Sequence, residues 1–127
     1  MVITAAAGGI GRAIAAAFVA QGSQVHLCDV DDAALASVRT DLPGVVATRV
    51  DLSDGSAIDD WLAGAIATLG GVDVLVNNAG TKGPTAFVED VEPDEWRDCL
   101  AVTLDSHYRT ARAVSPVMKR QGAGSIV

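Results

Sequence analysis

The chain has 127 residues, half of them hydrophobic, and carries a formal net charge of −7 at pH 7. This length predicts one domain, and the acidic balance argues against nucleic acid or an anionic membrane surface as a partner. The 13 glycines and the scarcity of aromatic residues suit helices packed closely on a sheet.

The cysteines and the start of the chain bear on the cellular compartment. Cys28 and Cys99 lie far apart in apolar runs, without a Cys-x-x-Cys spacing, so we expect two buried free thiols. The first residues contain no signal-like segment, and no window approaches the roughly 20 apolar residues of a membrane span. The sequence therefore predicts a cytoplasmic protein with no membrane partner.

Short apolar runs alternate with helical patterns along the chain. We expect strands over residues 2–4, 24–28, 45–50 and 72–76, followed by helices that begin near Gly11, Asp31 and Ser53, the last with Ser53 as its cap. A long helix should run from Pro93 to about Arg120, and residues 125–127 begin a fifth strand. This alternation predicts an α/β fold, a Rossmann-type doubly wound parallel sheet with helices on both faces.

A glycine-containing turn, Thr4-Ala5-Ala6-Ala7-Gly8-Gly9-Ile10-Gly11, follows the first strand. Ligands of doubly wound sheets bind at the carboxyl ends of the strands, where glycines and a helix N-terminus can approach a pyrophosphate. Many glycine-rich turns bind nothing, however, so this turn alone leaves both interpretations open.

Aspartates end the next two strands. Asp29 stands about 20 residues beyond the turn, where a carboxylate can accept hydrogen bonds from both ribose hydroxyls and repel a 2′-phosphate, which favours NAD over NADP. Asp51 could accept a hydrogen bond from an adenine amino group. Each aspartate has an alternative role as a cap of the following helix.

The fourth strand leads into Asn77-Asn78-Ala79-Gly80. A side-chain amide at the end of a buried strand must satisfy neighbouring backbone groups. We therefore expect Asn78 to stabilise this end of the sheet.

With these motifs and the stretch from Trp96 to Met118, the chain resembles the N-terminal half of a short-chain dehydrogenase/reductase over essentially all its length. The resemblance implies that residues 1–127 form an NAD(P)-binding Rossmann domain, incomplete at its C-terminal side. The cofactor-binding residues that it indicates are Thr4, Gly8, Ile10, Gly11, Asp29, Asp51, Leu52, Asn78, Ala79 and Gly80.

Three departures from the family's pattern bear on activity. Ala5 replaces the first glycine of the turn, where its methyl group could crowd the adenosine half of the cofactor. Thr103 stands in place of an Asn that holds a proton-relay water, and is the one candidate catalytic residue. The family's Ser and Tyr-x-x-x-Lys would follow Val127, and the pair Tyr108 and Arg112 on the long helix does not match their position.

The resemblance implies an oxidoreductase that transfers hydride between a nicotinamide and an alcohol or carbonyl substrate, although we expect this chain alone to be inactive. The alternative is a non-catalytic dinucleotide-binding fragment of a truncated or split gene. Neither His26 nor His107 has a partner at ligand spacing, so we expect no metal. The helix from Pro93 to Arg120 is apolar on two sides, and in the resembled family one side packs on a sister subunit, which implies a homo-oligomer.

Overall fold

The computed structural model describes residues 1–127. Its helices are α1 (Gly9–Ala20), α2 (Asp32–Asp41), α3 (Gly55–Leu69), α4 (Pro93–Leu100) and α5 (Ser106–Gln121). Its strands are β1 (Val2–Ile3), β2 (His26–Asp29), β3 (Val46–Arg49), β4 (Val74–Val76) and β5 (Ser125–Ile126). A 3₁₀ turn, η1 (Val88–Asp90), precedes α4, and a π-helical segment, η2 (Ala101–Asp105), joins α4 to α5.

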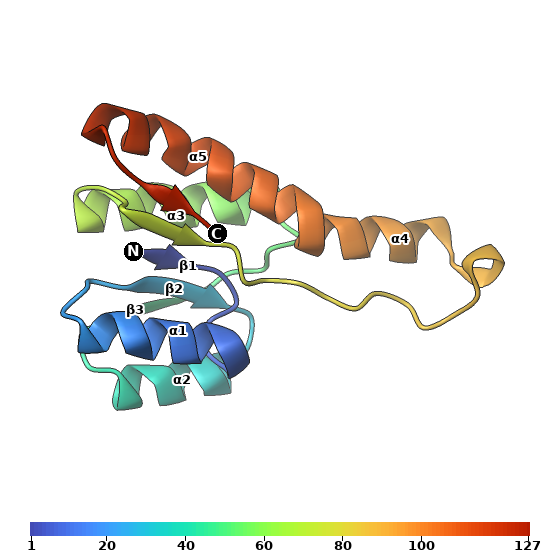
Figure 1. Cartoon of the computed structure of the whole chain (residues 1–127). Coiled ribbons are helices and arrows are strands. Elements are labelled where there is room, and N and C mark those ends of the chain that lie inside the picture. The colour runs from blue at the N-terminus through green and yellow to red at the C-terminus, as the bar shows by residue number, and fades with distance from the viewer.

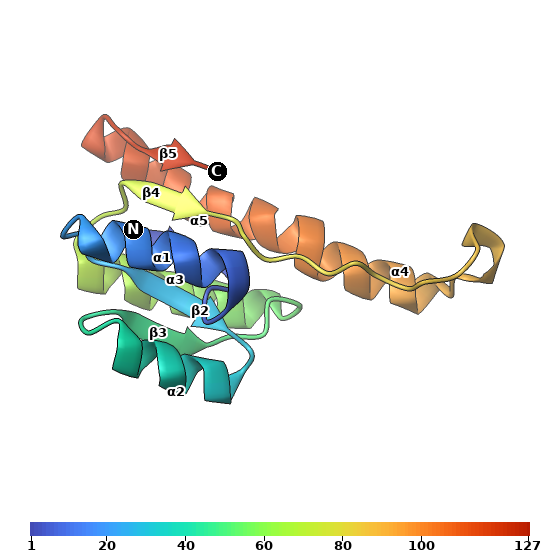
Figure 2. The ribbon, with the colours of Figure 1, turned by 60° about the horizontal axis from the view of Figure 1, so that its bottom comes forward.

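The five strands form one parallel sheet in the order β3-β2-β1-β4-β5. Val2 pairs with His26 on one side and with Leu75 on the other, so β1 occupies the centre of the sheet. Helices α1 and α2 cover one face, and α3 and α5 cover the other (Figures 1 and 2). The expected doubly wound α/β fold is confirmed.

The pleat of the strands divides the core between these two faces. Val2 belongs to a buried cluster that includes side chains of α3 and α5, whereas the next residue, Ile3, belongs to a second cluster built with α1 and α2. Leu27 and Cys28 alternate in the same way on β2. Side chains that alternate between two covered faces explain why these strands read as continuous apolar runs.

The buried His26 has a structural role, as expected. The indole Nε1–H of Trp61 on α3 donates a hydrogen bond to His26 Nδ1 at 3.1 Å. Burial is the main cause that lowers the pKa of His26, and the nearby amino group of Met1 lowers it further. The imidazole is therefore neutral, because Nδ1 must accept from the indole.

Several expected details are wrong. Asp54 rather than Ser53 caps α3, because its Oδ1 accepts from the backbone N–H groups of Ser56 and Ala57. Helix α1 begins at Gly9 rather than Gly11. Four of the expected strands are one or more residues too long, and β2 begins two residues later and ends one residue later than expected. The expected long helix is interrupted by the π-helical segment. Of the two cysteines expected to be buried, Cys28 is buried and Cys99 is only half-buried. Burial raises the pKa of the Cys28 thiol to about 12.

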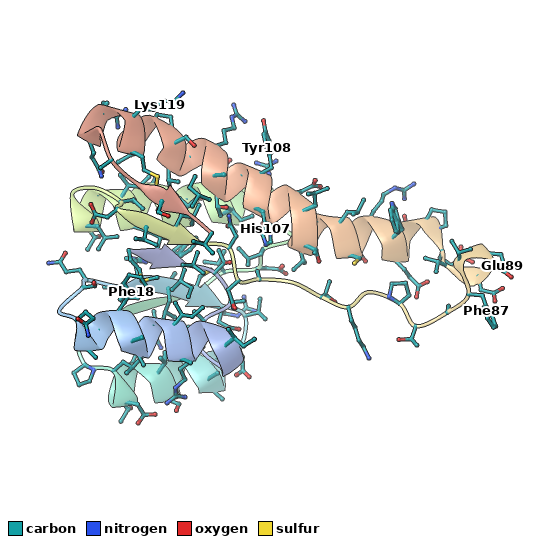
Figure 3. The ribbon with its side chains drawn as sticks, in the orientation of Figure 1. Phe18, Phe87, Glu89, His107, Tyr108 and Lys119 are labelled. Atoms are coloured by element: carbon teal, nitrogen blue, oxygen red, sulfur yellow. The ribbon has the colours of Figure 1, made fainter.

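One part of the chain stands out from the body of the fold. Residues 81–105, which we call the arm, run out from the end of β4, turn at η1 and return through α4 and η2 (Figure 1). No residue of the arm is buried, and Phe87 and Glu89 lie at its tip (Figure 3). The arm therefore contributes no fully buried side chain to the core.

Candidate functional site

The loops that follow β1, β2, β3 and β4 meet at the carboxyl edge of the sheet. A hollow of about 390 Å³ opens there. It is lined by residues from all four loops and one residue of the arm, namely Ala5, Asp29, Val30, Arg49, Val50, Asp51, Leu52, Ala79, Gly80 and Val102. Five of the expected cofactor-binding residues thus surround a single space, although they are up to 51 positions apart in sequence.

The turn after β1 is open toward the solvent above its glycines. A Cβ atom added to Gly8 or Gly9 would meet no atom within 4 Å, and Gly9 has a φ of +53°. Ile10 beside them is exposed. This turn leaves room for a ligand to approach its backbone.

Gly11 has a different role, in packing. A Cβ atom there would lie 2.6 Å from Asn78 Nδ2, 2.7 Å from Ala5 O and 2.8 Å from Ala6 Cα. Any side chain at this position would push α1 away from the two turns. Gly11 therefore holds the helix close to the sheet.

Ala5 is the one non-glycine residue with a positive φ, at +50°. An L-residue in this left-handed region is disfavoured by roughly 1–2 kcal/mol because its Cβ crowds the backbone. Ala5 also lines the hollow. The turn thus keeps the conformation that a glycine would adopt freely, and its methyl group stands at the site.

Helix α1 differs from its neighbours in how it begins. Its N-cap is Gly8, and no side chain caps it, whereas Asp31, Asp54 and the Glu92–Glu95 capping box serve α2, α3 and α4. Its first turn also contains no acidic residue. The N–H groups and positive dipole end of α1 therefore face the carboxyl edge without a side-chain acceptor.

Asp29 connects the ends of β1 and β2. Its Oδ2 accepts from the backbone N–H of Ala7 at 3.0 Å, and its Oδ1 accepts from Val30 at 2.8 Å and Asp31 at 3.2 Å. The alternative capping role for Asp29 is wrong, because Asp31 caps α2 through the N–H of Ala34. Asp29 fixes the glycine turn and still presents its carboxylate to the hollow.

Asp51 reaches the same hollow from the end of β3. Its Oδ1 accepts from the hydroxyl of Ser53 at 2.7 Å and from the Ser53 N–H at 2.9 Å. These hydrogen bonds, the hydroxyl's first, lower the pKa of the Asp51 carboxyl. The capping alternative is wrong here also, since Asp54 caps α3, and Asp51 remains an ionised acceptor at the rim.

Asn78 joins the turn after β4 to the turn after β1, as expected. Its Nδ2 donates to Thr4 O at 3.1 Å and to Ala5 O at 2.8 Å. The buried Thr4 hydroxyl accepts from the N–H groups of Asn78 and Ala79, each at 3.0 Å. The Thr4 side chain therefore lies behind the turn and positions it, rather than facing the hollow.

Helix α5 holds the same turn from its other side, which the sequence reasoning missed. His107 Nε2 lies 2.8 Å from Ala79 O, and Thr110 Oγ1 donates to Asn77 Oδ1 at 2.6 Å. The i, i+3 spacing of two polar residues on a helix that packs against a strand could have indicated this contact. His107 points toward the sheet, whereas Tyr108 points away from it (Figure 3).

Thr103 lies on the π-helical segment at the base of the arm. Its Oγ1 accepts from the N–H of Thr81 at 3.2 Å, which ties η2 to the loop after Gly80. Tyr108 is exposed on the outer side of α5. The hydroxyl of Thr103 therefore lies beside the site, and that of Tyr108 does not.

The structure contains no group of three or more His, Cys, Asp or Glu side chains that could hold a metal ion. Among the helices, none combines the length and apolar character that crossing a membrane requires.

Comparison with known proteins gives consistent matches over the whole chain. The family described as short chain dehydrogenase matches residues 1–127. A 2-dehydro-3-deoxy-L-rhamnonate dehydrogenase (NAD(+)) of a Sphingomonas strain is 31% identical over 126 residues, which are 99% of this chain and 51% of that protein. D-beta-hydroxybutyrate dehydrogenase of Cupriavidus necator is 34% identical over 98% of this chain and 50% of its own.

Solved structures agree in fold. A metagenomic short-chain oxidoreductase in complex with NADP superposes with a TM-score of 0.93 at 35% identity, over 98% of this chain and 58% of that one. A short-chain dehydrogenase from Streptomyces avermitilis superposes at 0.90 with 38% identity, over 98% and 46%. The chain spans about half the length of the curated relatives that it matches.

Proposed function

The chain belongs to the short-chain dehydrogenase family, and from this premise we propose that it forms the cofactor-binding half of a nicotinamide-dependent oxidoreductase. The observation that carries the proposal is the hollow at the carboxyl edge. It brings Asp29, Asp51 and Ala79–Gly80 together from three strand ends, beside the uncapped start of α1.

In this proposal each loop holds one part of the dinucleotide. Gly8, Gly9 and the N–H groups of Ile10 and Gly11 would hold the pyrophosphate, because the helix dipole there favours an anion. Asp29 accepts from the ribose hydroxyls, and Asp51 and Leu52 receive the adenine. Asn78, Ala79 and Gly80 would hold the nicotinamide end, and the buried hydroxyl of Thr4 positions Asn78 and Ala79.

The proposed reaction would act on an alcohol or carbonyl substrate. When bound, the nicotinamide donates or accepts the hydride. Thr103 presents a hydroxyl beside the site at the family's proton-relay position, while the Ser and Tyr-x-x-x-Lys of the family have no counterpart in residues 1–127. We therefore expect no turnover from the chain alone, and a non-catalytic dinucleotide-binding fragment is the alternative.

NAD is the preferred cofactor in this proposal. The Asp29 carboxylate faces the hollow and would repel a 2′-phosphate on the ribose. The similar proteins differ in cofactor, since the Sphingomonas enzyme carries NAD(+) in its name and the metagenomic structure contains NADP. The preference therefore depends on the carboxylate itself.

A homo-oligomer through the region Pro93–Arg120 is also part of the proposal. Trp96, Leu104 and Tyr108 are 59%, 58% and 63% exposed along this region. Residues 89–105 contain seven acidic side chains and one arginine, whereas residues 106–127 contain four basic side chains and no acid. Two copies packed antiparallel would bury the apolar residues and place opposite charges together.

We place the protein in the cytoplasm, where its thiols would stay reduced.

Calorimetric titration with NAD and NADP tests the cofactor site. We expect NAD to bind more tightly, and Asp29→Ala to weaken NAD by about 1.5–3 kcal/mol through the loss of a charged acceptor. Asp60→Ala removes the same charge from an exposed position on α3 and should leave affinity unchanged. Failure of the wild-type chain to bind either dinucleotide would refute the proposal.

A further inference from the structure

A groove runs along the arm, between its outgoing segment and helix α4, which run side by side (Figure 1). Its volume is about 620 Å³, within the roughly 300–1,000 Å³ that is typical of small-molecule sites. Ten residues line it, and none of them lines the hollow at the carboxyl edge. The groove is therefore a site separate from the one proposed for the cofactor.

The groove is apolar and open to solvent. Its hydrophobic residues are Ala86, Val88, Val91, Trp96 and Cys99, and no residue of the arm is buried. Val88 and Trp96 are 87% and 59% exposed. Apolar side chains that gather around an open groove and stay exposed mark a binding surface.

Both walls of the groove are held in place within the arm. The N–H of Thr81 donates to Thr103 Oγ1 at 3.2 Å, which joins the start of the outgoing segment to η2. At the other end, Glu95 Oε2 accepts from the N–H of Glu92 at 3.1 Å, which fixes the start of α4. The groove is therefore preformed, so a ligand need not order its walls.

The charged residues of the arm are distributed unevenly around this groove. The arm contains seven acidic side chains and two basic ones. Both basic residues, Lys82 and Arg97, line the groove, and no acidic residue does. Lys82 takes part in none of the four ion pairs of the chain, whereas Arg97 pairs with Asp94 on its own helix. The groove thus combines apolar surface with an unpaired ammonium group, in a chain of net charge −7.

We propose that this groove binds an amphipathic carboxylate of the fatty-acid type, with its hydrocarbon chain on the apolar residues and its carboxylate at Lys82. A cationic amphiphile would make the same apolar contacts but would meet two positive charges and no negative one. Each methylene group removed from water is worth up to about fourfold in affinity, so affinity should rise with the length of the hydrocarbon chain. The inference goes beyond the proposed cofactor site and does not rest on it.

The test is calorimetric titration of the whole chain with decanoate and with decyltrimethylammonium, which has the same hydrocarbon chain and the opposite charge. We expect one saturable site for decanoate and at least about tenfold weaker binding of the cation. Lys82→Ala should weaken decanoate by about three- to fivefold, the range of an exposed ion pair, and Lys82→Glu by more. Lys119→Ala removes the same charge from an exposed position of α5 and should leave the affinity unchanged. Because Trp96 lines the groove, its emission should shift to shorter wavelength as decanoate saturates.

A second copy of the chain is the competing occupant, because α4 belongs to the region proposed to pair two copies. Titrations at two protein concentrations separate the two occupants. The same affinity for decanoate at both concentrations supports the proposal, since six of the ten lining residues precede Pro93 and lie outside that region. Weaker binding at the higher concentration would show that a second copy covers the groove, and would overturn the proposal.

Three further results would overturn it. These are equal binding of the two amphiphiles, an unchanged affinity for decanoate in Lys82→Glu, and uptake of decanoate without saturation. Lys82 is exposed, so melting curves of its variants should match that of the wild-type chain. Titration with NAD is independent of these outcomes, because a chain that binds decanoate and no dinucleotide would refute the proposed function and leave this inference standing.

Discussion

At the carboxyl edge of the sheet, four hydrogen bonds join Thr4 and Ala5 to Asn78 and Ala79, whereas no residue of the arm is buried. The two regions differ in the contacts that keep them in place. The edge is fixed from within the chain by buried polar contacts. The arm presents exposed apolar side chains that this chain does not cover. A substitution at the edge should therefore change the stability of the fold, whereas a substitution in the arm should change association.

The two tryptophans represent the same contrast. Trp61 is buried on α3 and bonded to His26, whereas Trp96 on α4 is mostly exposed. Their fluorescence should differ accordingly, with the emission of Trp61 reporting unfolding of the body. Single-tryptophan variants allow each region to be followed separately.

The largest effect should follow Gly11→Ala. The added methyl group would overlap Ala5 O and Ala6 Cα, which are backbone atoms, and Asn78 Nδ2. Overpacking of this kind costs about 3 kcal/mol, measured as the free energy of unfolding in urea. Gly64→Ala is the matched control at an exposed position of helix α3, where an added Cβ meets nothing, and it should stabilise by about 0.5–1 kcal/mol. A neutral Gly11→Ala would mean that α1 can move away from the edge freely.

Asn78→Ala should give the second-largest loss of stability. It removes the two hydrogen bonds to Thr4 O and Ala5 O, and unsatisfied buried groups cost roughly 1–3 kcal/mol. The melting temperature should fall. Asn78→Asp keeps the size of the side chain but replaces the donor, so it should be no more stable than the alanine variant. An unchanged melting temperature would contradict the role of Asn78 as the link between the turns.

The third prediction concerns pH and the body of the fold. Burial lowers the folded-state pKa of His26 below its usual 6.5, so the unfolded chain binds more protons. The contribution of neutral His26 to the free energy of unfolding is full above pH 6.5. It is lost as pH falls below that value toward the folded pKa, with a slope of at most about 1.4 kcal/mol per pH unit. Trp61 fluorescence during urea unfolding at several pH values measures it.

His26→Gln is the control for this prediction. The glutamine oxygen can accept from Trp61 Nε1–H but does not titrate in this range. The slope between pH 6.5 and 5 should be smaller in the variant. The difference between the two chains also isolates His26 from the Met1 amino group, whose pKa is lowered mainly by burial. Equal slopes would show that His26 is protonated without cost.

Ala5→Gly should give a smaller change of opposite sign. It relieves the left-handed conformation at φ +50°, offset by the greater freedom of glycine when unfolded. We expect a gain of about 0.5–1 kcal/mol in stability. Ala6→Gly, at a neighbouring position without positive φ, should destabilise instead. A loss of stability in Ala5→Gly would mean that the turn is not strained.

The edge was more predictable from sequence than the arm. Glycine, aspartate and asparagine at strand ends have few structural roles that suit them. Gly8 therefore precedes α1, Asp29 ends β2 and Asn78 joins the two turns, as expected. Helix caps were less predictable, because Ser53 and Asp54 are adjacent and both can cap. The π-helical segment was not expected. The contact from His107 to Ala79 joins residues 28 positions apart, so the i, i+3 spacing on α5 indicates it only together with the packing of that helix on the sheet.

The smallest effect on folding should come from Trp96→Ala, in the arm. The indole is 59% exposed and belongs to no buried cluster, so the unfolding free energy at low protein concentration should change by less than about 0.5 kcal/mol. Association should respond differently, because a large exposed aromatic is the kind of residue that anchors an interface. Light scattering coupled to gel filtration measures it, and Tyr108→Ala tests the outer side of α5 in the same way. If Trp96→Ala destabilised the chain at every concentration, the arm would be held by its own fold. If neither variant shifted the oligomer toward monomer, the exposed face of α4 and α5 would not be the interface.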